Sequence, residues 1–304
     1  MDILKKRDMY MVAKKQQKIG FIGFGEVGRT FSHRMIEMGG DVFAYDKFPD
    51  RVAKKAAELK IPLYRTLGDL IDSCDIILSS LWPDVALDTA KEAAQSLSSR
   101  KIYCDLNSIS PETTSEIQKV ISASNADFVK IAIMAAIPDR GFEAPLLVGG
   151  TKSEEIAEFF SKLGLNIRAI GLDPRQPAAI KILRSICLKG IVALAYEMLN
   201  AAEKYGVVEQ VFESASEVMS RSSFKETAEN WLASTAIHAR RRAKEMEEVI
   251  ETLEALGIHP VMSLGTKKIF EEIADFNLDK VFQGQIPESF SKFIEAINGQ
   301  VFSQ

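Results

Sequence analysis

Residues 18–28 read KIGFIGFGEVG, and the prediction of the fold begins with them. Its first five residues form a short apolar run typical of a buried strand, and the glycines fit the pattern G-x-G-x-x-G before a helical pattern that continues to about Met38. A second strand-like run, DVFAY (41–45), ends next to Asp46, about 20 residues after the glycines. This order of strand, glycine turn, helix, strand and acidic residue is the context that a dinucleotide-binding turn requires.

Each glycine of such a turn has its own task. Gly23 permits the tight turn, Gly25 lets a pyrophosphate approach the backbone, and Gly28 lets the helix pack on the strand. The first N–H groups of the helix then face the phosphates. The predicted cofactor-binding residues of the turn are Gly23, Phe24, Gly25, Glu26, Val27 and Gly28. The alternative is a plain strand–turn–helix unit whose glycines serve packing alone.

Asp46 predicts which cofactor the turn binds. Its carboxylate would accept hydrogen bonds from the hydroxyls of the adenosine ribose and would repel a 2′-phosphate, so NAD is favoured over NADP. Lys47, the next residue, keeps NADP open as an alternative because a cation there would serve the phosphate instead.

Short strands and helices continue to alternate as far as residue 171. Further strands are predicted at 75–81, 101–105, 128–136, 145–150 and 166–170, with helices at about 49–59, from Pro83, from 110–114 and at 152–163. Such alternation predicts an α/β, Rossmann-type, doubly wound and mostly parallel sheet.

Beyond Pro177 the chain is predicted to be an all-α C-terminal domain. Its predicted helices are 178–205, 207–220, 224–235, 236–256 and shorter ones beyond. We therefore divide the chain into an N-terminal extension (1–17), an NAD(P)-binding Rossmann domain (18–171) and an all-helical substrate and dimerisation domain (172–304). The helix 178–205 is apolar on almost every face, so we expect a homodimer at minimum.

Composition excludes several classes of protein. The 304 residues carry 38 Lys and Arg against 42 Asp and Glu, a net charge of -4 that argues against nucleic acid as a partner. No apolar run reaches the ~20 residues that cross a bilayer, so no membrane contact is expected, and the first 18 residues lack the apolar core of a secretory signal. Three cysteines without C-x-x-C spacing and three histidines without H-x-x-x-H spacing predict neither a disulfide scaffold nor a metal site. We expect a cytoplasmic protein.

Three further motifs carry a resemblance to a known family: LWP (81–83), DLNSISP (105–111) and KILRS (181–185). With the glycine turn, they make the sequence similar to the 6-phosphogluconate dehydrogenase / 3-hydroxyisobutyrate dehydrogenase superfamily of β-hydroxyacid dehydrogenases, over roughly residues 18–275. Within it, the chain resembles the phosphogluconate-dehydrogenase-like branch with an uncharacterised helical C-terminal domain.

The resemblance implies roles for the residues of these motifs. Leu81, Trp82 and Pro83 match the family's Leu-Pro cofactor segment, and Asn107 and Ser108 occupy the polar positions near the nicotinamide ribose. Lys181 matches the family's catalytic lysine. The resemblance thus implies reversible oxidation of a β-hydroxyacid-type substrate by a nicotinamide cofactor.

Two departures from the family concern the substrate. The family's carboxylate-binding motif, D-x-P-V-S-G-G, has only KIAIMAA (130–136) as its counterpart, with Met134 in place of the serine and Ala135-Ala136 in place of the glycines. Ser185 stands where the family has an amide side chain. We therefore expect the family's chemistry here with a different substrate.

Lys181 lies early in the apolar helix, on one face with Arg184, Ser185 and Leu188. Partial desolvation lowers the pKa of a lysine and permits proton exchange near neutral pH, as the oxidation of an alcohol requires. We predict Lys181 as the general acid/base and Arg184 and Ser185 as substrate-binding residues. The alternative is a solvent-facing lysine.

A second basic cluster, HARRRAKEM (238–246), lies on a predicted amphipathic helix. Arg242 is next to the stripe of residues expected to be buried, and a half-buried arginine favours an anion such as a substrate carboxylate or phosphate. The alternative is an internal ion pair with Glu245 or another acidic residue. His238 lies on the same side and is added to the predicted substrate-binding residues, although a plain helix-face histidine is the more ordinary interpretation.

The leading functional hypothesis is therefore an NAD-dependent dehydrogenase acting on a small anionic hydroxyacid or a related alcohol. Two alternatives stay open at this point. One is an NADPH-dependent imine or keto reductase, which is favoured if Met134 and the alanines form an apolar pocket. The other is a non-catalytic NAD-binding protein that responds to redox state.

Overall fold

The computed structural model describes residues 17–301, which divide into two compact units at Ile186/Cys187. The boundary falls inside one long helix, α9 (Arg175–Tyr205), so this helix contributes residues to both units. Of the predicted N-terminal extension, residues 1–16 lie outside the described residues.

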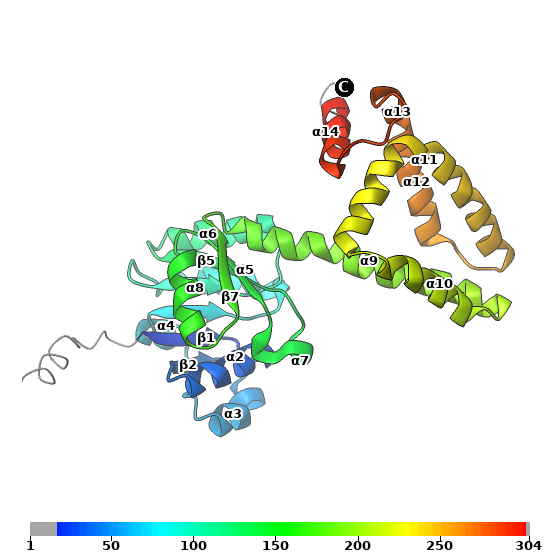
Figure 1. Ribbon diagram of the computed structural model, residues 1–304. Helices are drawn as coiled ribbons and strands as arrows, with labels where there is room; N and C mark the ends of the chain where they lie inside the picture. The colour runs from blue at the N-terminus through cyan, green and yellow to red at the C-terminus, as the bar shows by residue number, and fades with distance from the viewer. Residues whose placement is uncertain (1–16, 302–304) are drawn as a thin grey trace, which may run out of the picture. The chain divides into compact units, whose positions relative to one another are not determined.

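A single sheet forms the centre of the first unit (Figure 1). Its described strands are β1 (Lys18–Ile22), β2 (Asp41–Tyr45), β3 (Ile76–Ser79), β4 (Ile102–Asp105), β5 (Asp127–Ile133), β6 (Leu146–Gly149) and β7 (Ile167–Gly171). They lie in the order β2-β1-β3-β4-β5-β6-β7. All neighbouring pairs are parallel except β5 and β6, which are antiparallel. This mostly parallel, doubly wound sheet confirms the predicted fold class.

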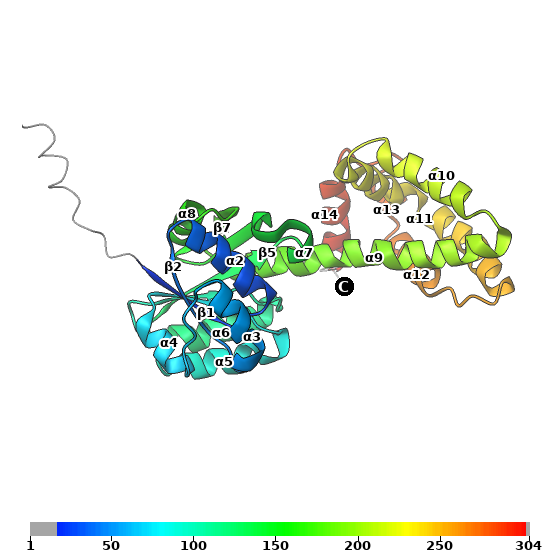
Figure 2. The ribbon, with the colours of Figure 1, turned by 90° about the horizontal axis from the view of Figure 1, so that it is seen from below.

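Helices cover both faces of the sheet (Figure 1 and Figure 2). They are α2 (Glu26–Glu37), α3 (Pro49–Glu58), α4 (Leu67–Ser73), α5 (Ala86–Ala93), α6 (Pro111–Ser122), α7 (Ile137–Arg140) and α8 (Ser153–Lys162). Successive strand residues alternate between two buried clusters: Ile76 and Leu78 pack with α2, α3 and α8, while Ile77 packs with α4, α5 and α6. Because both faces are covered, the strands read as continuous apolar runs.

Helices α4 and α7 are among the features that differ from the predicted elements. Helix α4 was not predicted; it begins at Leu67 because the Thr66 hydroxyl accepts a hydrogen bond from the Asp69 N–H (3.1 Å) and caps it. The strand predicted at 128–136 ends at Ile133, since Ile133 pairs with Leu146, the first residue of its partner β6. Residues 134–136 therefore leave the sheet and lead into α7.

The second unit consists of helices. After α9 come α10 (Val208–Ser220), α11 (Phe224–Ala255), α12 (Val261–Asp275), α13 (Leu278–Val281) and α14 (Phe290–Val301). The helices predicted separately at 224–235 and 236–256 form one helix, so that division was wrong. The hydroxyls of Ser234 and Thr235 both donate to the Trp231 carbonyl (3.0 and 2.7 Å), which satisfies them inside the helix without breaking it.

A buried carboxylate holds the start of α12. Pro260 precedes this helix and supplies no side-chain cap. Instead, Glu197 of α9 accepts hydrogen bonds from the N–H groups of Met262 (2.8 Å) and Ser263 (2.9 Å) and from the Ser263 hydroxyl (2.6 Å). Burial raises the pKa of Glu197, but these bonds and nearby His259 outweigh it and hold the pKa below its ordinary value.

We expect Glu197→Gln to destabilise the protein by about 1–3 kcal/mol at pH 7, because an amide cannot accept all three bonds and leaves buried donors unpaired. The folded-state pKa is below the unfolded one. The carboxylate therefore makes its full contribution to the free energy of unfolding above the unfolded-state pKa of about 4.3. This contribution is lost as the pH falls through the folded-state pKa. Urea unfolding at pH 7 and at acid pH measures both effects. The exposed neighbour variant Glu203→Gln is the control, and an equal loss in both variants would contradict this assignment.

Candidate functional site

The turn after β1 has room only for glycine at two of its three glycine positions. Gly23 has a φ of +86°, and a Cβ there would lie 2.6 Å from the Ser80 carbonyl oxygen. A Cβ on Gly28 would lie 2.8 Å from the Gly23 carbonyl oxygen. At Gly25, by contrast, a Cβ would meet no atom within 4 Å, and no side chain caps α2 there. The turn thus fits a pyrophosphate, which would approach the backbone where the loop is open.

Asp46 is held beside this turn. One carboxylate oxygen accepts the Phe24 N–H (2.9 Å) and the other accepts the Phe48 N–H (2.8 Å). Each oxygen has a further lone pair for a ribose hydroxyl. The ring of Phe24 is buried in the core, so only the backbone of this residue is available in the turn. Lys47, which follows Asp46, is exposed.

The segments after β3 and β4 are joined through Asn107, which is only 3% exposed. Its side-chain oxygen accepts the Leu81 N–H (2.5 Å), and its amide nitrogen donates to the Ser79 hydroxyl (3.0 Å) and to Asp105 (2.7 Å). Asn107 therefore fixes the backbone of both segments through internal bonds. The predicted cofactor residues Trp82 and Pro83 are exposed at the surface next to Leu81.

A buried ion pair lies beneath these segments, and sequence reasoning did not single it out. Lys130 of β5 pairs with Asp105 of β4, and its ammonium also donates to the Asn107 carbonyl (2.5 Å). The two residues are direct cross-strand partners in the sheet. The signal in the sequence was a lysine inside the apolar run FVKIAI (128–133).

Lys181 of α9 reaches the same edge of the sheet. Its ammonium donates a 2.7 Å hydrogen bond to the hydroxyl of Ser108, the residue after Asn107. Burial is the largest cause that lowers the pKa of Lys181, the positive charges of Lys130 and Arg184 lower it further, and Asp105 opposes them. The resulting pKa is about 8, so both protonation states are populated near neutral pH.

The two predicted neighbours of Lys181 have different surroundings. Arg184 is exposed one turn further along α9. The hydroxyl of Ser185 donates to the Lys181 carbonyl (3.0 Å), a bond within the helix. Their predicted contacts with a substrate stay predictions.

Arg242 and His238 belong to the second unit. The half-buried Arg242 donates to the Ser234 hydroxyl (2.8 Å), to the Thr235 hydroxyl and to the Trp231 carbonyl (3.1 Å), all on its own helix. The alternative ion pair with Glu245 is formed by Arg241 instead. Burial, first, and nearby Arg241, second, lower the pKa of Arg242. An anion bound to Arg242, with His238 beside it, stays a prediction.

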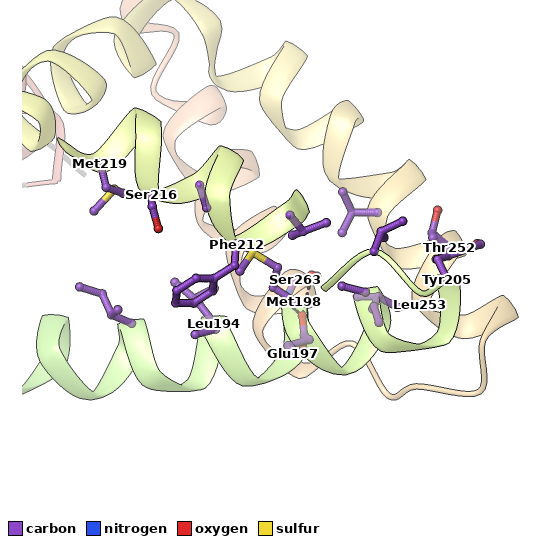
Figure 3. A pocket seen from close by; sticks show the side chains of 18 of the residues that line it. Leu194, Glu197, Met198, Tyr205, Phe212, Ser216, Met219, Thr252, Leu253 and Ser263 are labelled. Atoms are coloured by element: carbon purple, nitrogen blue, oxygen red, sulfur yellow. Dashed lines mark hydrogen bonds between the residues drawn. The ribbon is translucent and has the colours of Figure 1, made fainter. Parts of the chain in front are cut away.

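The second unit also contains an apolar groove of about 850 Å³ between α9, α10 and α11. Figure 3 shows Leu194 and Met198 of α9 facing Phe212 of α10, with Leu253 of α11 at one end. Glu197 lies at the groove, where its carboxylate is already bonded to Ser263.

Residues 17–301 contain neither a candidate metal site nor a helix that could span a membrane. Within this range, no group of three or more His, Cys, Asp or Glu side chains is placed to hold a metal ion. No helix of the same range combines the length and the apolar character that crossing a membrane requires.

Comparisons with known proteins bear on both units. Residues 18–171 match the family described as the NAD binding domain of 6-phosphogluconate dehydrogenase, and residues 202–273 match a domain of unknown function (DUF1932). A conserved protein of unknown function, whose solved structure is described as similar to 3-hydroxyacid dehydrogenases, is 35% identical to this chain. That match covers 85% of this chain and 97% of the other, with a TM-score of 0.59.

More distant relatives have described activities. The mitochondrial 3-hydroxyisobutyrate dehydrogenase of Drosophila melanogaster is 26% identical over 206 residues, 64% of this chain and 61% of the dehydrogenase, so the chain spans less than two thirds of that relative. The imine reductase of Myxococcus stipitatus, solved in complex with NADP+, is 16% identical with a TM-score of 0.67, and the match covers 91% of this chain and 99% of the reductase. This second likeness shows a shared fold.

Proposed function

Because this chain belongs to the family of the NAD binding domain of 6-phosphogluconate dehydrogenase, we propose that it is an oxidoreductase that transfers a hydride between NAD(P) and a small hydroxyacid or a related alcohol. This proposal rests on the hydrogen bond between Lys181 and Ser108. It lies at the carboxyl edge of the parallel strands, the edge that also carries the glycine turn and where ligands of such sheets bind.

Residues 23–28 and Asp46 would hold the dinucleotide, which supplies the hydride-transfer chemistry when bound. Lys181 would move the proton: as a neutral amine it takes the proton of the substrate hydroxyl, and as an ammonium it returns that proton to the carbonyl oxygen in the reverse direction. The exposed guanidinium of Arg184 beside it favours an anionic substrate. Separately, we propose that Arg242 of the second unit binds an anion.

Lys181→Met should lower kcat by about 10²–10⁴-fold, the usual cost of removing a general acid/base, with little change in the affinity for NADH. In the unmodified protein, alcohol oxidation should rise with pH to a plateau above about 8, because it needs the neutral amine. Carbonyl reduction should fall above the same value, because it needs the ammonium. Steady-state kinetics from pH 6 to 10 measure both.

The matched control is Lys189→Met, which removes an exposed lysine from the same helix. It should leave kcat and its pH profile unchanged. Near-normal turnover by Lys181→Met would contradict the proposed role and leave Lys181 as a structural residue.

We propose NAD as the preferred cofactor, because Asp46 is held by two N–H groups and cannot readily turn away from a 2′-phosphate. NADH should bind several-fold more tightly than NADPH, and Asp46→Ala should narrow or reverse that preference. Fluorescence titration of both cofactors tests this. If the unmodified protein binds NADPH equally well or better, and Lys47→Ala then abolishes that binding, Lys47 is the phosphate ligand instead.

A second candidate function is the NADPH-dependent reduction of an imine or ketone. The observation that favours it is the half-exposed Met134, which follows β5 where the family's motif has a serine. A substrate panel separates the two candidates: oxidation of small hydroxyacids with NAD supports the first, and reduction of cyclic imines or apolar ketones with NADPH supports the second.

We also propose that the chain forms a homodimer through α9. Large apolar side chains of this helix are exposed along its length, including Leu183, Ile186 (73%), Val192 (69%) and Leu194. Residues of α9 beyond Cys187 also line the apolar groove. Exposed apolar surface of this extent is typical of an interface, and a second copy offers the same surface in return.

Light scattering at micromolar concentration should therefore return about twice the 33.7 kDa of one chain. Ile186→Glu should shift the protein toward monomer, because it places a charge in the interface. Met38→Glu changes an exposed methionine at the end of α2 and should leave the mass unchanged. A monomeric mass for the unmodified protein would reject the dimer.

A further inference from the structure

Lys130 and Asp105 form a buried ion pair in the first unit's described sheet for which the proposed function has no use. Lys130 is 1% exposed, and its partner Asp105 is fully buried. Neither ion can exchange its partner for water, so both depend on the bonds that the fold supplies.

The ion pair is bonded to the backbone of the turn that follows β4. Asp105 accepts both the backbone N–H (3.1 Å) and the side-chain amide (2.7 Å) of Asn107, while Lys130 donates to the Asn107 carbonyl (2.5 Å). The peptide groups on both sides of Asn107 are thus fixed. The next residue is Ser108, whose hydroxyl accepts the bond from Lys181.

We propose that Lys130 is a positioning residue for Lys181. Through its buried pair with Asp105, Lys130 holds residues 105–107 in place. This arrangement presents the Ser108 hydroxyl to the Lys181 ammonium. The catalytic meaning of this role rests on the proposed function. The contacts themselves do not.

Lys130 also acts on Lys181 through its charge. The charged groups that influence Lys181 are Lys130 on β5, Arg184 on α9 and Asp105 on β4. Of the three, Lys130 has the largest effect, and it opposes protonation. Since the pair is buried, salt screens this charge little. Loss of Lys130 would remove a like charge, which favours the protonated form of Lys181, and would release the turn, which withdraws the Ser108 acceptor and favours the neutral form. Because Lys130 has the largest effect of the charged groups around Lys181, we expect the protonated form to gain.

The test measures the titration of Lys181 without turnover. Reductive methylation of the full-length protein at a series of pH values, with the Lys181 peptide quantified by mass spectrometry, gives its pKa in the absence of cofactor and substrate. The unmodified protein should titrate near 8. Lys130→Met should raise that midpoint by roughly one unit, and Lys130→Arg, which keeps the charge, should restore it.

Lys101→Met is the matched control. Lys101 precedes β4 at the opposite end of the strand and donates to the carbonyls of Ile71 (2.5 Å) and Cys74 (2.8 Å). Its loss should reduce stability without moving the Lys181 midpoint. If Lys130→Met does not fold because Asp105 is left unpaired, Lys130→Met combined with Asp105→Asn removes both ions. The midpoint should still rise, because Lys130 influences Lys181 more than Asp105 does.

An unchanged midpoint in folded Lys130→Met, or in its combination with Asp105→Asn, overturns the proposal. An equal shift in Lys101→Met also overturns it, since the effect would then follow general destabilisation. The proposed function can fail on its own. In that case the Lys181 midpoint would move as expected in Lys130→Met, while Lys181→Met would keep its turnover.

Discussion

The close approach of Gly23 to Ser80 is the constraint on which the carboxyl edge of the sheet depends. Gly23 donates its N–H to the Tyr45 carbonyl (2.8 Å), and its own carbonyl accepts the Ser80 hydroxyl (3.0 Å). The ends of β1, β2 and β3 therefore meet at one residue whose φ and lack of space admit only glycine. One residue beyond Ser80, Leu81 is bonded to Asn107, which extends the same arrangement to β4.

The chemistry proposed for this edge follows from an unequal distribution of charge. Lys130, Lys181 and Arg184 bring positive charge together, and Asp105 is the acid that acts on Lys181 among them. A substrate with an anionic end suits this surplus, while the neighbouring cations keep Lys181 from holding its proton tightly. The apolar segment after β5 lacks the serine and the glycines of the family's carboxylate-binding motif. In the proposed function, the cations of Lys181 and Arg184 would bind the anionic end of the substrate instead.

The helical unit meets a different physical requirement. Its long helices leave apolar side chains of α9 exposed and a groove open beside them, while its buried acid, Glu197, serves only to start α12. The polar groups at the start of α12 are thus hydrogen-bonded, whereas apolar side chains on the face of α9 stay exposed. That imbalance is why we infer a second copy as the cover.

Local sequence patterns were sufficient to predict the strand–turn–helix at 18–37, the acidic residue after β2, the alternation through β7 and the helical character beyond it. The prediction of helix boundaries was wrong where side-chain hydrogen bonds determine them. Thr66 starts α4, and Ser234 and Thr235 do not interrupt α11. Packing of the strands decides that Lys130 faces Asp105 and that Asn107 is enclosed. Within α11, side-chain reach decides that Arg241 pairs with Glu245 while Arg242 bonds to hydroxyls. Periodicity reports which face of an element is buried, but the partner of a buried charge depends on strand register and side-chain reach, and these are settled when the elements pack.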